Sequence, residues 1–264
     1  MILVNIIDRR IRRARARISV IVGTVLNKLK GCGSMNSMTS MSRTVSFSLF
    51  FAVIVVCSPE SQVNESQGSD LNPLLYVNRF TEEPPERFQI QFITTKGDFI
   101  VQVYAAWAPI GSARFYNLVK QGWYDGVRFH RVLENFTVGW GIHDDPYVNY
   151  FWQKELLPDD PSFESNTKGR ISFARSGPNS RTTQVFVNYK DNSSLDDQFV
   201  PFGEVSRGME VLEDLYAGYG DGPPRGDGVY QAMAIARGHE YFEEGFPKLD
   251  RILQATILGE TVLP

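Results

Sequence analysis

Side chains able to carry out chemistry are few in the globular part of this 264-residue chain. Both cysteines, Cys32 and Cys57, precede that part, so a mature domain without its N-terminal segment would have no thiol. Cysteine nucleophiles and cysteine-ligated zinc are then excluded. Residues 143–145 read His-Asp-Asp. With only three histidines in the chain and no further ligand pattern, we interpret them as a polar turn and expect no metal.

Arg131, within Phe-His-Arg-Val at 129–132, is a different kind of candidate. Its guanidinium is permanently charged and donates hydrogen bonds in a fixed geometry. Taken alone, an arginine in a strand is more often a solvated or ion-paired surface residue. The aromatic residues near it would by default belong to the core. Its interpretation therefore depends on the segments that surround it.

Short strands are the elements that must position these side chains. Residues 88–104 alternate apolar and polar side chains on both sides of Lys96-Gly97, which predicts a β-hairpin. Helical spacing predicts a helix at 105–121 and a second at 209–216, followed by a glycine-rich loop at 218–228. Further strands are predicted at 127–133, 136–140, 169–174, 184–189, 200–205 and 251–258. This pattern predicts a mainly-β fold, a closed barrel with helical caps.

Charged residues are distributed unevenly along the chain. Residues 1–44 hold nine basic residues and one acidic residue, whereas the other 220 residues hold 18 basic and 29 acidic ones, a net charge of −11. An acidic body does not attract a phosphate backbone, so we expect no nucleic-acid partner. A hydrophobic share of 42% and a charged share of 22% are typical of a globular protein.

Residues 1–57 are predicted to be an N-terminal extension. The uncharged apolar run at 45–57 has the length of a signal-peptide core and is short for a bilayer span. Translation from Met41 would give a compact secretory signal, which predicts the secretory pathway or the extracellular space. An organelle transit peptide and a membrane anchor through 45–57 are the alternatives. Residues 58–86 are predicted to be a polar linker, and 87–264 the folded domain.

Three ordered segments of the folded domain together resemble the cyclophilin family, in a subgroup also common in bacteria. A lone Phe-His-Arg-Val would be weak, but order and spacing agree over about 170 residues. The segments are Phe129–Val132 with Asn135-Phe136 and Gly141; Gly169–Asn179 with Thr183–Val187; and Leu195-Asp196 with Phe199–Val205 and Gly208-Met209. The resemblance implies a closed eight-stranded antiparallel β-barrel capped by two α-helices.

The resemblance also implies an activity, cis/trans isomerisation of peptide bonds before proline in the service of protein folding. Rotation about that bond is opposed by a barrier of roughly 18–20 kcal/mol, and lowering it requires no metal and no cofactor. A catalyst needs a dry pocket for the proline ring, a donor that weakens amide resonance, and contacts that favour the twisted transition state. The partners implied are proline-containing peptides or client proteins, and we expect a monomer.

Site roles follow from the same resemblance. Arg131 and Gln184 match the family's catalytic positions: the arginine would donate to the prolyl nitrogen, and the amide would contact the substrate backbone. Eight further residues match substrate-binding positions, namely Phe136, Thr137, Ala174, Arg175, Ser176, Phe186, Leu195 and Phe199. An apolar, aromatic-walled cup suits a pyrrolidine ring and excludes water.

Departures from the family pattern qualify this expectation. Gly139 stands where the family usually has a glutamine, so Arg131 should be less well oriented and the isomerase slower. Ser194 replaces a tryptophan that contacts cyclosporin in many members, and we therefore expect weak cyclosporin binding. Phe199 replaces a common histidine, and Thr137 a commoner Met or Val. The rival hypothesis is a non-catalytic module that binds proline peptides through a degenerate active site.

Overall fold

The computed structural model describes residues 72–259, all of them in the second of two compact units, 64–264. The predicted signal segment and its apolar run at 45–57 lie outside the described residues. No helix within residues 72–259 combines the length and the apolar character needed to cross a membrane.

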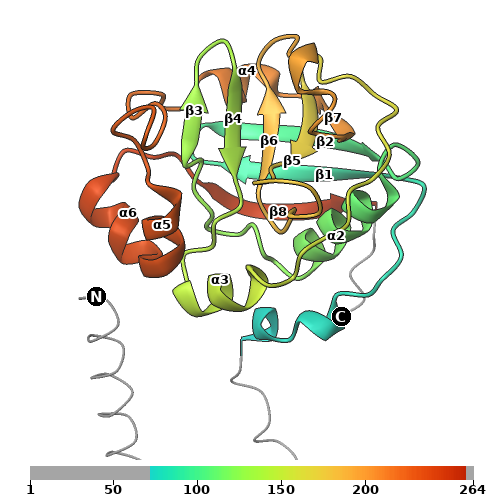
Figure 1. Cartoon of the computed structure of the whole chain (residues 1–264), viewed down its shortest axis with the longest axis horizontal. Coiled ribbons are helices and arrows are strands. Elements are labelled where there is room, and N and C mark those ends of the chain that lie inside the picture. Colours follow the sequence, from blue (N-terminus) through green and yellow to red (C-terminus); the bar gives the residue numbers. More distant parts are fainter. Residues whose placement is uncertain (1–71, 260–264) are drawn as a thin grey trace, which may run out of the picture. The chain divides into compact units, whose positions relative to one another are not determined.

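Eight strands form one antiparallel sheet in the order β3-β4-β6-β5-β7-β2-β1-β8 (Figure 1). Their bounds are β1 Arg87–Thr94, β2 Gly97–Tyr104, β3 Arg131–Leu133, β4 Thr137–Trp140, β5 Arg170–Phe173, β6 Val185–Asn188, β7 Pro201–Arg207 and β8 Ile252–Leu258. Each strand corresponds to one predicted from the sequence: alternation of apolar and polar side chains predicted β1 and β2, and short β-like segments predicted the other six.

The sheet curls, but its two end strands are not joined by a ladder. Only one isolated bridge, between Arg128 and Arg251, connects the segment before β3 with the start of β8. The predicted closed barrel is therefore seen as an open, curled sheet. The predicted strand at 127–133 also shortens to β3. Its first residues hydrogen-bond instead to 250–252, for example Phe129 N–H to Asp250 O at 3.0 Å.

Aromatic side chains fill the inner face of the curl. Phe92 and Phe99, opposite one another on β1 and β2, stack with ring centroids 4.7 Å apart. Trp140 of β4 packs edge-on against both rings, and Phe115 of helix α2 (Pro109–Lys120) packs against Phe92. All four side chains are fully buried, and each stabilises the fold by about 1.5–3 kcal/mol. This core fixes the hairpin of β3 and β4, which carries Arg131 on β3 and Phe136 in the turn between the strands.

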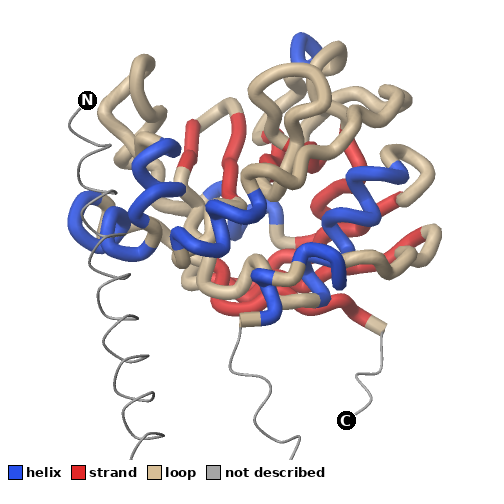
Figure 2. The backbone as a smooth tube through the Cα atoms, turned by 60° about the horizontal axis from the view of Figure 1, so that its bottom comes forward, coloured by secondary structure: helices blue, strands red, loops and turns tan. Residues whose placement is uncertain are grey.

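Five α-helices occur within the described residues, which corrects the expected cap of two: α2 Pro109–Lys120, α3 Pro146–Trp152, α4 Met209–Glu213, α5 Gln231–Arg237 and α6 His239–Gly245. The predicted helix at 105–121 corresponds to α2, and the one at 209–216 shortens to α4. The other three are seven residues long, too short for a periodic signal. Figure 2 shows these helices lying around the strands, and α5 packs against both α3 and α6.

The His-Asp-Asp segment at 143–145 forms the polar turn that starts α3. The carboxylate of Asp145 accepts a hydrogen bond from Tyr147 N–H at 2.8 Å, and Pro146 takes the first helical position, both common features of helix starts. Asp144 pairs with buried Arg128. These two carboxylates thus have structural partners.

Residues 72–86, the described end of the segment predicted as a linker, pack against the fold. Leu74 is buried, and its carbonyl accepts a hydrogen bond from Trp152 Nε1 at 2.7 Å. Phe80 packs edge-on against the Trp152 ring at 4.6 Å. The side chain of Asn117 on α2 bonds both the N–H and the carbonyl of Glu82. A few apolar residues in a polar stretch thus anchor this segment to α2 and α3.

Candidate active site

A cleft of about 710 Å³ lies beside the β3–β4 hairpin. Its walls come from that hairpin, from residues 174–186, from 195–199, and from the glycine-rich loop after α4. The structure brings all ten predicted site residues to this one cleft: Arg131, Phe136, Thr137, Ala174, Arg175, Ser176, Gln184, Phe186, Leu195 and Phe199. Their individual roles stay predictions, but their assembly from distant parts of the chain is now a structural fact.

The guanidinium of Arg131 is held on two sides. Its Nε donates to Asp221 Oδ1 at 2.8 Å and its Nη2 to Asp221 Oδ2 at 3.0 Å, a two-pronged pairing. Its Nη1 donates to the hydroxyl of Thr137 at 3.0 Å. An arginine has five N–H donors, so donors are left for a ligand. The ring of Phe136 lies 5.7 Å from the guanidinium carbon and provides a cation–π contact.

Asp221 is the residue of this site that the sequence interpretation missed. It lies in the loop at 218–228, which stood out for its glycines and gave no sign of a contact with a strand 90 residues earlier. Hydrogen bonding from Arg131, and then the positive charge of that arginine, lower the pKa of the Asp221 carboxyl, although partial burial opposes the shift. The carboxylate of Asp221 and the guanidinium of Arg131 therefore form a pair of opposite charges at neutral pH.

His130, next to Arg131 in the chain, is neutral at physiological pH. Burial and then the nearby charge of Arg131 lower the pKa of His130 to about 3, while a hydrogen bond with Gln184 opposes the shift. Gln184 is half-buried and lines the cleft. The imidazole thus contacts the predicted substrate-binding amide without adding a second positive charge beside Arg131.

Apolar side chains form a cup beside the guanidinium. Phe186 and Phe199 meet edge to face with ring centroids 5.3 Å apart, and Phe136 and Leu195 complete the lining. The main chain of Phe136 is fixed because its carbonyl accepts from Tyr189 N–H at 2.9 Å and from Asn192 Nδ2 at 3.0 Å. The cup is therefore set in place by buried polar contacts behind it.

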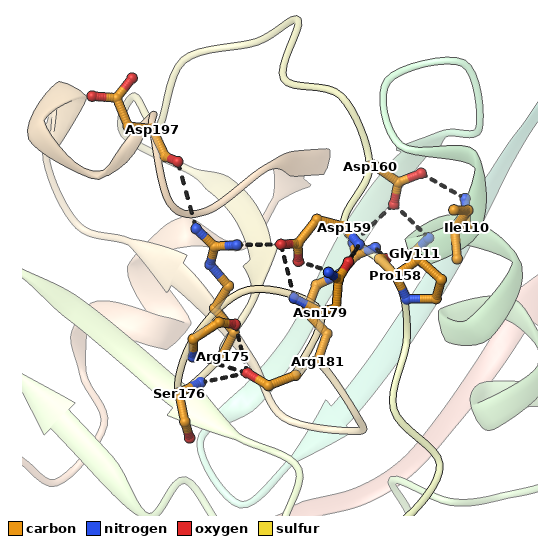
Figure 3. A network of polar contacts seen from close by, with 12 residues as sticks. Ile110, Gly111, Pro158, Asp159, Asp160, Arg175, Ser176, Asn179, Arg181 and Asp197 are labelled. Atoms are coloured by element: carbon orange, nitrogen blue, oxygen red, sulfur yellow. Dashed lines mark hydrogen bonds and ion pairs between the residues drawn. The ribbon is translucent and has the colours of Figure 1, made fainter.

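Carboxylates of the Asp159-Asp160 pair hold the cleft segment at 174–182 (Figure 3). Asp159 pairs with Arg175 and accepts from Asn179 N–H at 2.9 Å. Asp160 binds Arg181 Nη1 at 2.8 Å. Its two oxygens also accept from the N–H groups of Ile110 and Gly111 at the start of α2, where the helix dipole favours a negative charge. This network ties Ala174, Arg175 and Ser176 to the rigid part of the fold.

Gly139 is the cross-strand partner of Arg131 in the hairpin. A Cβ at this position would meet only atoms at 3.7 Å or more, so a side chain would fit there. Ser194, the other notable departure, is exposed. Gly139 therefore gives Arg131 no side-chain partner, whereas Asp221 and Thr137 bind its guanidinium.

Comparison with known proteins identifies the family. Residues 89–236 match the model of "Cyclophilin type peptidyl-prolyl cis-trans isomerase/CLD". The chain is 31% identical over 136 residues to "Peptidyl-prolyl cis-trans isomerase-like 1" of Rhizopus delemar, covering 49% of this chain and 81% of that protein. It is 30% identical over 132 residues to "Peptidyl-prolyl cis-trans isomerase" of Acinetobacter baylyi, covering 48% and 70%.

A solved cyclophilin-type isomerase from Cryptosporidium parvum aligns with 19% identity and a TM-score of 0.49, covering 66% of this chain and 99% of that one. The assignment rests on the sequence matches, which extend over the strands and loops that form the cleft. The chain belongs to the cyclophilin-type peptidyl-prolyl cis-trans isomerase family, and it is an isomerase of peptide bonds that precede proline.

Proposed function

We propose that this cleft isomerises Xaa-Pro bonds in proline-containing peptides and client proteins, with Arg131 as the donor to the prolyl nitrogen. The observation that carries the proposal is the guanidinium of Arg131. It is fixed by Asp221 and Thr137, lies beside a cup of three phenylalanines, and keeps donors for a ligand. Donor and apolar cup are the two elements that rotation about a prolyl bond requires.

The mechanism follows from amide resonance. In the planar amide the nitrogen lone pair is shared with the carbonyl, whereas in the twisted transition state it is localised on nitrogen and accepts a hydrogen bond. A donor aimed at that nitrogen stabilises the transition state more than either ground state. Each 1.36 kcal/mol of such preference gives about a tenfold rate increase.

Each wall of the cleft would bind a different portion of the substrate. Phe136, Phe186 and Phe199, with Leu195, would hold the proline ring and exclude water, so that the donor acts in a medium of low dielectric constant. Gln184 and the main chain at 174–176 would hold the residues that precede proline while the far side of the bond turns.

The experiment compares cis/trans exchange of a short Xaa-Pro peptide, measured by exchange NMR, with the full chain and with Arg131→Ala. Arg207→Ala, which removes an exposed arginine at the end of β7, is the matched control. We expect a loss of roughly 100-fold in kcat/KM for Arg131→Ala and no change for the control. Equal rates for all three proteins and for buffer would refute the proposal.

The rival, a binding module without turnover, predicts peptide binding without faster exchange. The same experiment separates the two functions, because peptide shift changes report binding while the exchange rate reports catalysis. The named isomerases among the relatives favour catalysis.

Further features of the protein are proposed on the sequence. The acidic charge of the body argues against a nucleic-acid partner. The small, exposed Ser194 supports weak cyclosporin binding. We also propose a monomer that enters the secretory pathway through the apolar run at 45–57. N-terminal sequencing of the mature protein tests this localisation: a start after the run supports it, whereas a start before residue 45 contradicts cleavage.

We propose, finally, that the curled sheet closes into a barrel. Support comes from the Arg128–Arg251 bridge and from the paired hydrogen bonds of 126–129 with 250–252. Slow hydrogen exchange at the amides of Phe129 and Ile252 is the expected result, and exchange at loop rates would contradict closure.

A further inference from the structure

We propose that Asp221, in the glycine-rich loop at 218–228, is the positioning residue of Arg131. The proposal rests on the proposed function, since it assigns how the catalytic arginine is oriented. Nothing in the sequence resemblance assigned a role to this loop or to its carboxylate.

The contact geometry supports orientation over simple charge pairing. Asp221 engages Nε and Nη2 together, at 2.8 and 3.0 Å. A two-pronged pairing of this kind fixes the plane of a guanidinium as well as its position. Thr137 fixes Nη1 from the neighbouring strand. The two hydrogen bonds to Asp221 occupy the guanidinium edge formed by Nε and Nη2. The N–H groups that neither Asp221 nor Thr137 binds therefore lie on Nη1 and Nη2, away from that edge.

Asp221 is itself held in place by its loop. Its carbonyl accepts from Gly228 N–H at 2.9 Å, and its Oδ1 also accepts from Gly222 N–H at 3.0 Å. The loop is packed so closely that a Cβ at Gly222 would lie 2.2 Å from Val229 O, and one at Gly226 would lie 2.4 Å from Asp221 O. The glycines therefore permit a tight fold around Asp221, and a carboxylate on a tight loop can orient a side chain on the sheet.

The residue paired with Arg131 across the hairpin provides it with no side-chain support. Gly139 lies across from Arg131 in the hairpin and offers no side-chain group to it. A Cβ there would be 3.9 Å from Arg131 Cβ, in ordinary contact, and the backbone of Gly139 is not in the left-handed region. A glutamine at 139 could therefore reach the guanidinium and replace the support lost on removal of Asp221.

The test uses the full chain with Asp221→Ala, Asp221→Glu, and Asp221→Ala combined with Gly139→Gln. Asp227→Ala is the matched control, since Asp227 lies in the same loop, is exposed, and does not line the cleft. Exchange NMR over a range of Xaa-Pro peptide concentrations gives kcat and KM separately. The ¹⁵N–¹H signal of Arg131 Nε reports whether the guanidinium is held.

Asp221→Ala is expected to lower kcat by roughly tenfold, because misplaced catalytic groups lose rate steeply. KM should change less than twofold, and the protected Nε signal should be lost. Asp221→Glu and the added Gly139→Gln should each recover part of kcat, whereas Asp227→Ala should leave it unchanged. Thermal unfolding separates loss of orientation from loss of fold, since a damaged fold lowers the unfolding temperature, whereas loss of orientation alone leaves it unchanged.

A kcat of Asp221→Ala equal to that of the wild type would overturn the proposal. A higher kcat would also overturn it, by showing that Asp221 competes with the substrate for Arg131. Loss of kcat without loss of the Nε signal would also overturn it. A wild-type protein no faster than Arg131→Ala would instead refute the proposed function, so the two failures are distinguishable.

Discussion

At the scale of single residues, burial and ion pairing decide which side chains of the cleft carry a charge. Arg131 is charged and paired, whereas His130 beside it is kept neutral by burial. A neutral imidazole places no second positive charge directly beside the guanidinium of Arg131. Two residues adjacent in the chain thus differ in charge, since Arg131 has a carboxylate partner and the buried His130 does not.

This difference predicts a pH dependence of stability. The pKa of His130 is about 3 in the folded protein and about 6.5 in the unfolded chain. The unfolded state therefore binds more protons between these values, and stability is lost as pH falls below 6.5. The slope should reach at most about 1.4 kcal/mol per pH unit from this group.

Urea unfolding between pH 7 and 5, compared with His130→Gln, measures this slope while most carboxylates stay ionised. NMR titration of the imidazole is an independent check that does not require the variant to fold. A His130 ring that titrates near pH 6.5 would contradict the burial argument.

The aromatic cup gives a second residue-scale prediction. Phe186→Ala removes a ring that packs edge-on against Phe199 and lines the cleft. We expect a rise in KM of about tenfold or more, from the loss of apolar contact with the proline ring. Phe163→Ala, which removes an exposed ring outside the cleft, should leave KM unchanged, and a KM of Phe186→Ala equal to wild type would exclude Phe186 from the cup.

At the scale of elements, the sequence predicted the strands and only part of the helices. Alternation identified β1 and β2, whose burial alternates, whereas the other six were predicted as short β-like segments, of which β4 and β6 are buried at every residue. Helices α5 and α6 were missed because each is seven residues long and is stabilised by packing on a second apolar cluster around Phe242. For α3, the pair Asp145-Pro146 was a start signal that could have been recognised.

In the candidate site, too, local sequence patterns were predictable and long-range contacts were not. The ten residues that match the family motifs were placed in one cleft, since short ordered motifs are visible in a sequence. Asp221 was not predicted because its role depends on a contact between residues 90 positions apart. Closure of the barrel was expected from the resemblance, whereas the structure pairs the end strands only by one bridge.

Gly238, between α5 and α6, carries an element-scale prediction. Its φ is +57°, and a Cβ there would lie 1.9 Å from Asp144 O. Gly238→Ala should destabilise the fold by about 2 kcal/mol or more, through strain and displacement of the Asp144 turn. Gly245→Ala, where a Cβ meets nothing within 4 Å, is the control for urea unfolding, and equal stability of the two variants would contradict this packing.

At the scale of the whole molecule, the folded unit begins before the first strand. Leu74 is only 6% exposed, and its carbonyl and neighbours are bound by α3. Leu74→Ala should therefore cost about 2–3 kcal/mol in unfolding free energy, whereas Leu156→Ala, at an exposed site, should cost little. A negligible change in the unfolding free energy of Leu74→Ala would contradict this and support the prediction that residues 72–86 belong to the linker.

The folded unit is thus a curled β-sheet whose hairpin, network of carboxylates and glycine-rich loop together form and hold the walls of one cleft. The core fixes β3 and β4, Asp159 and Asp160 fix the wall at 174–182, and Asp221 holds the guanidinium of Arg131. Segments far apart in the chain therefore meet where a prolyl bond would lie.

Arg131→Lys tests the central claim most directly, because lysine keeps the charge and loses the planar fork of donors. The measurement is the cis/trans exchange rate of an Xaa-Pro peptide by NMR, with peptide binding followed in the same titration. The account predicts that Arg131→Lys binds peptide within about twofold of wild type and loses at least about tenfold in kcat. A kcat equal to that of wild type would contradict an oriented guanidinium as the source of catalysis.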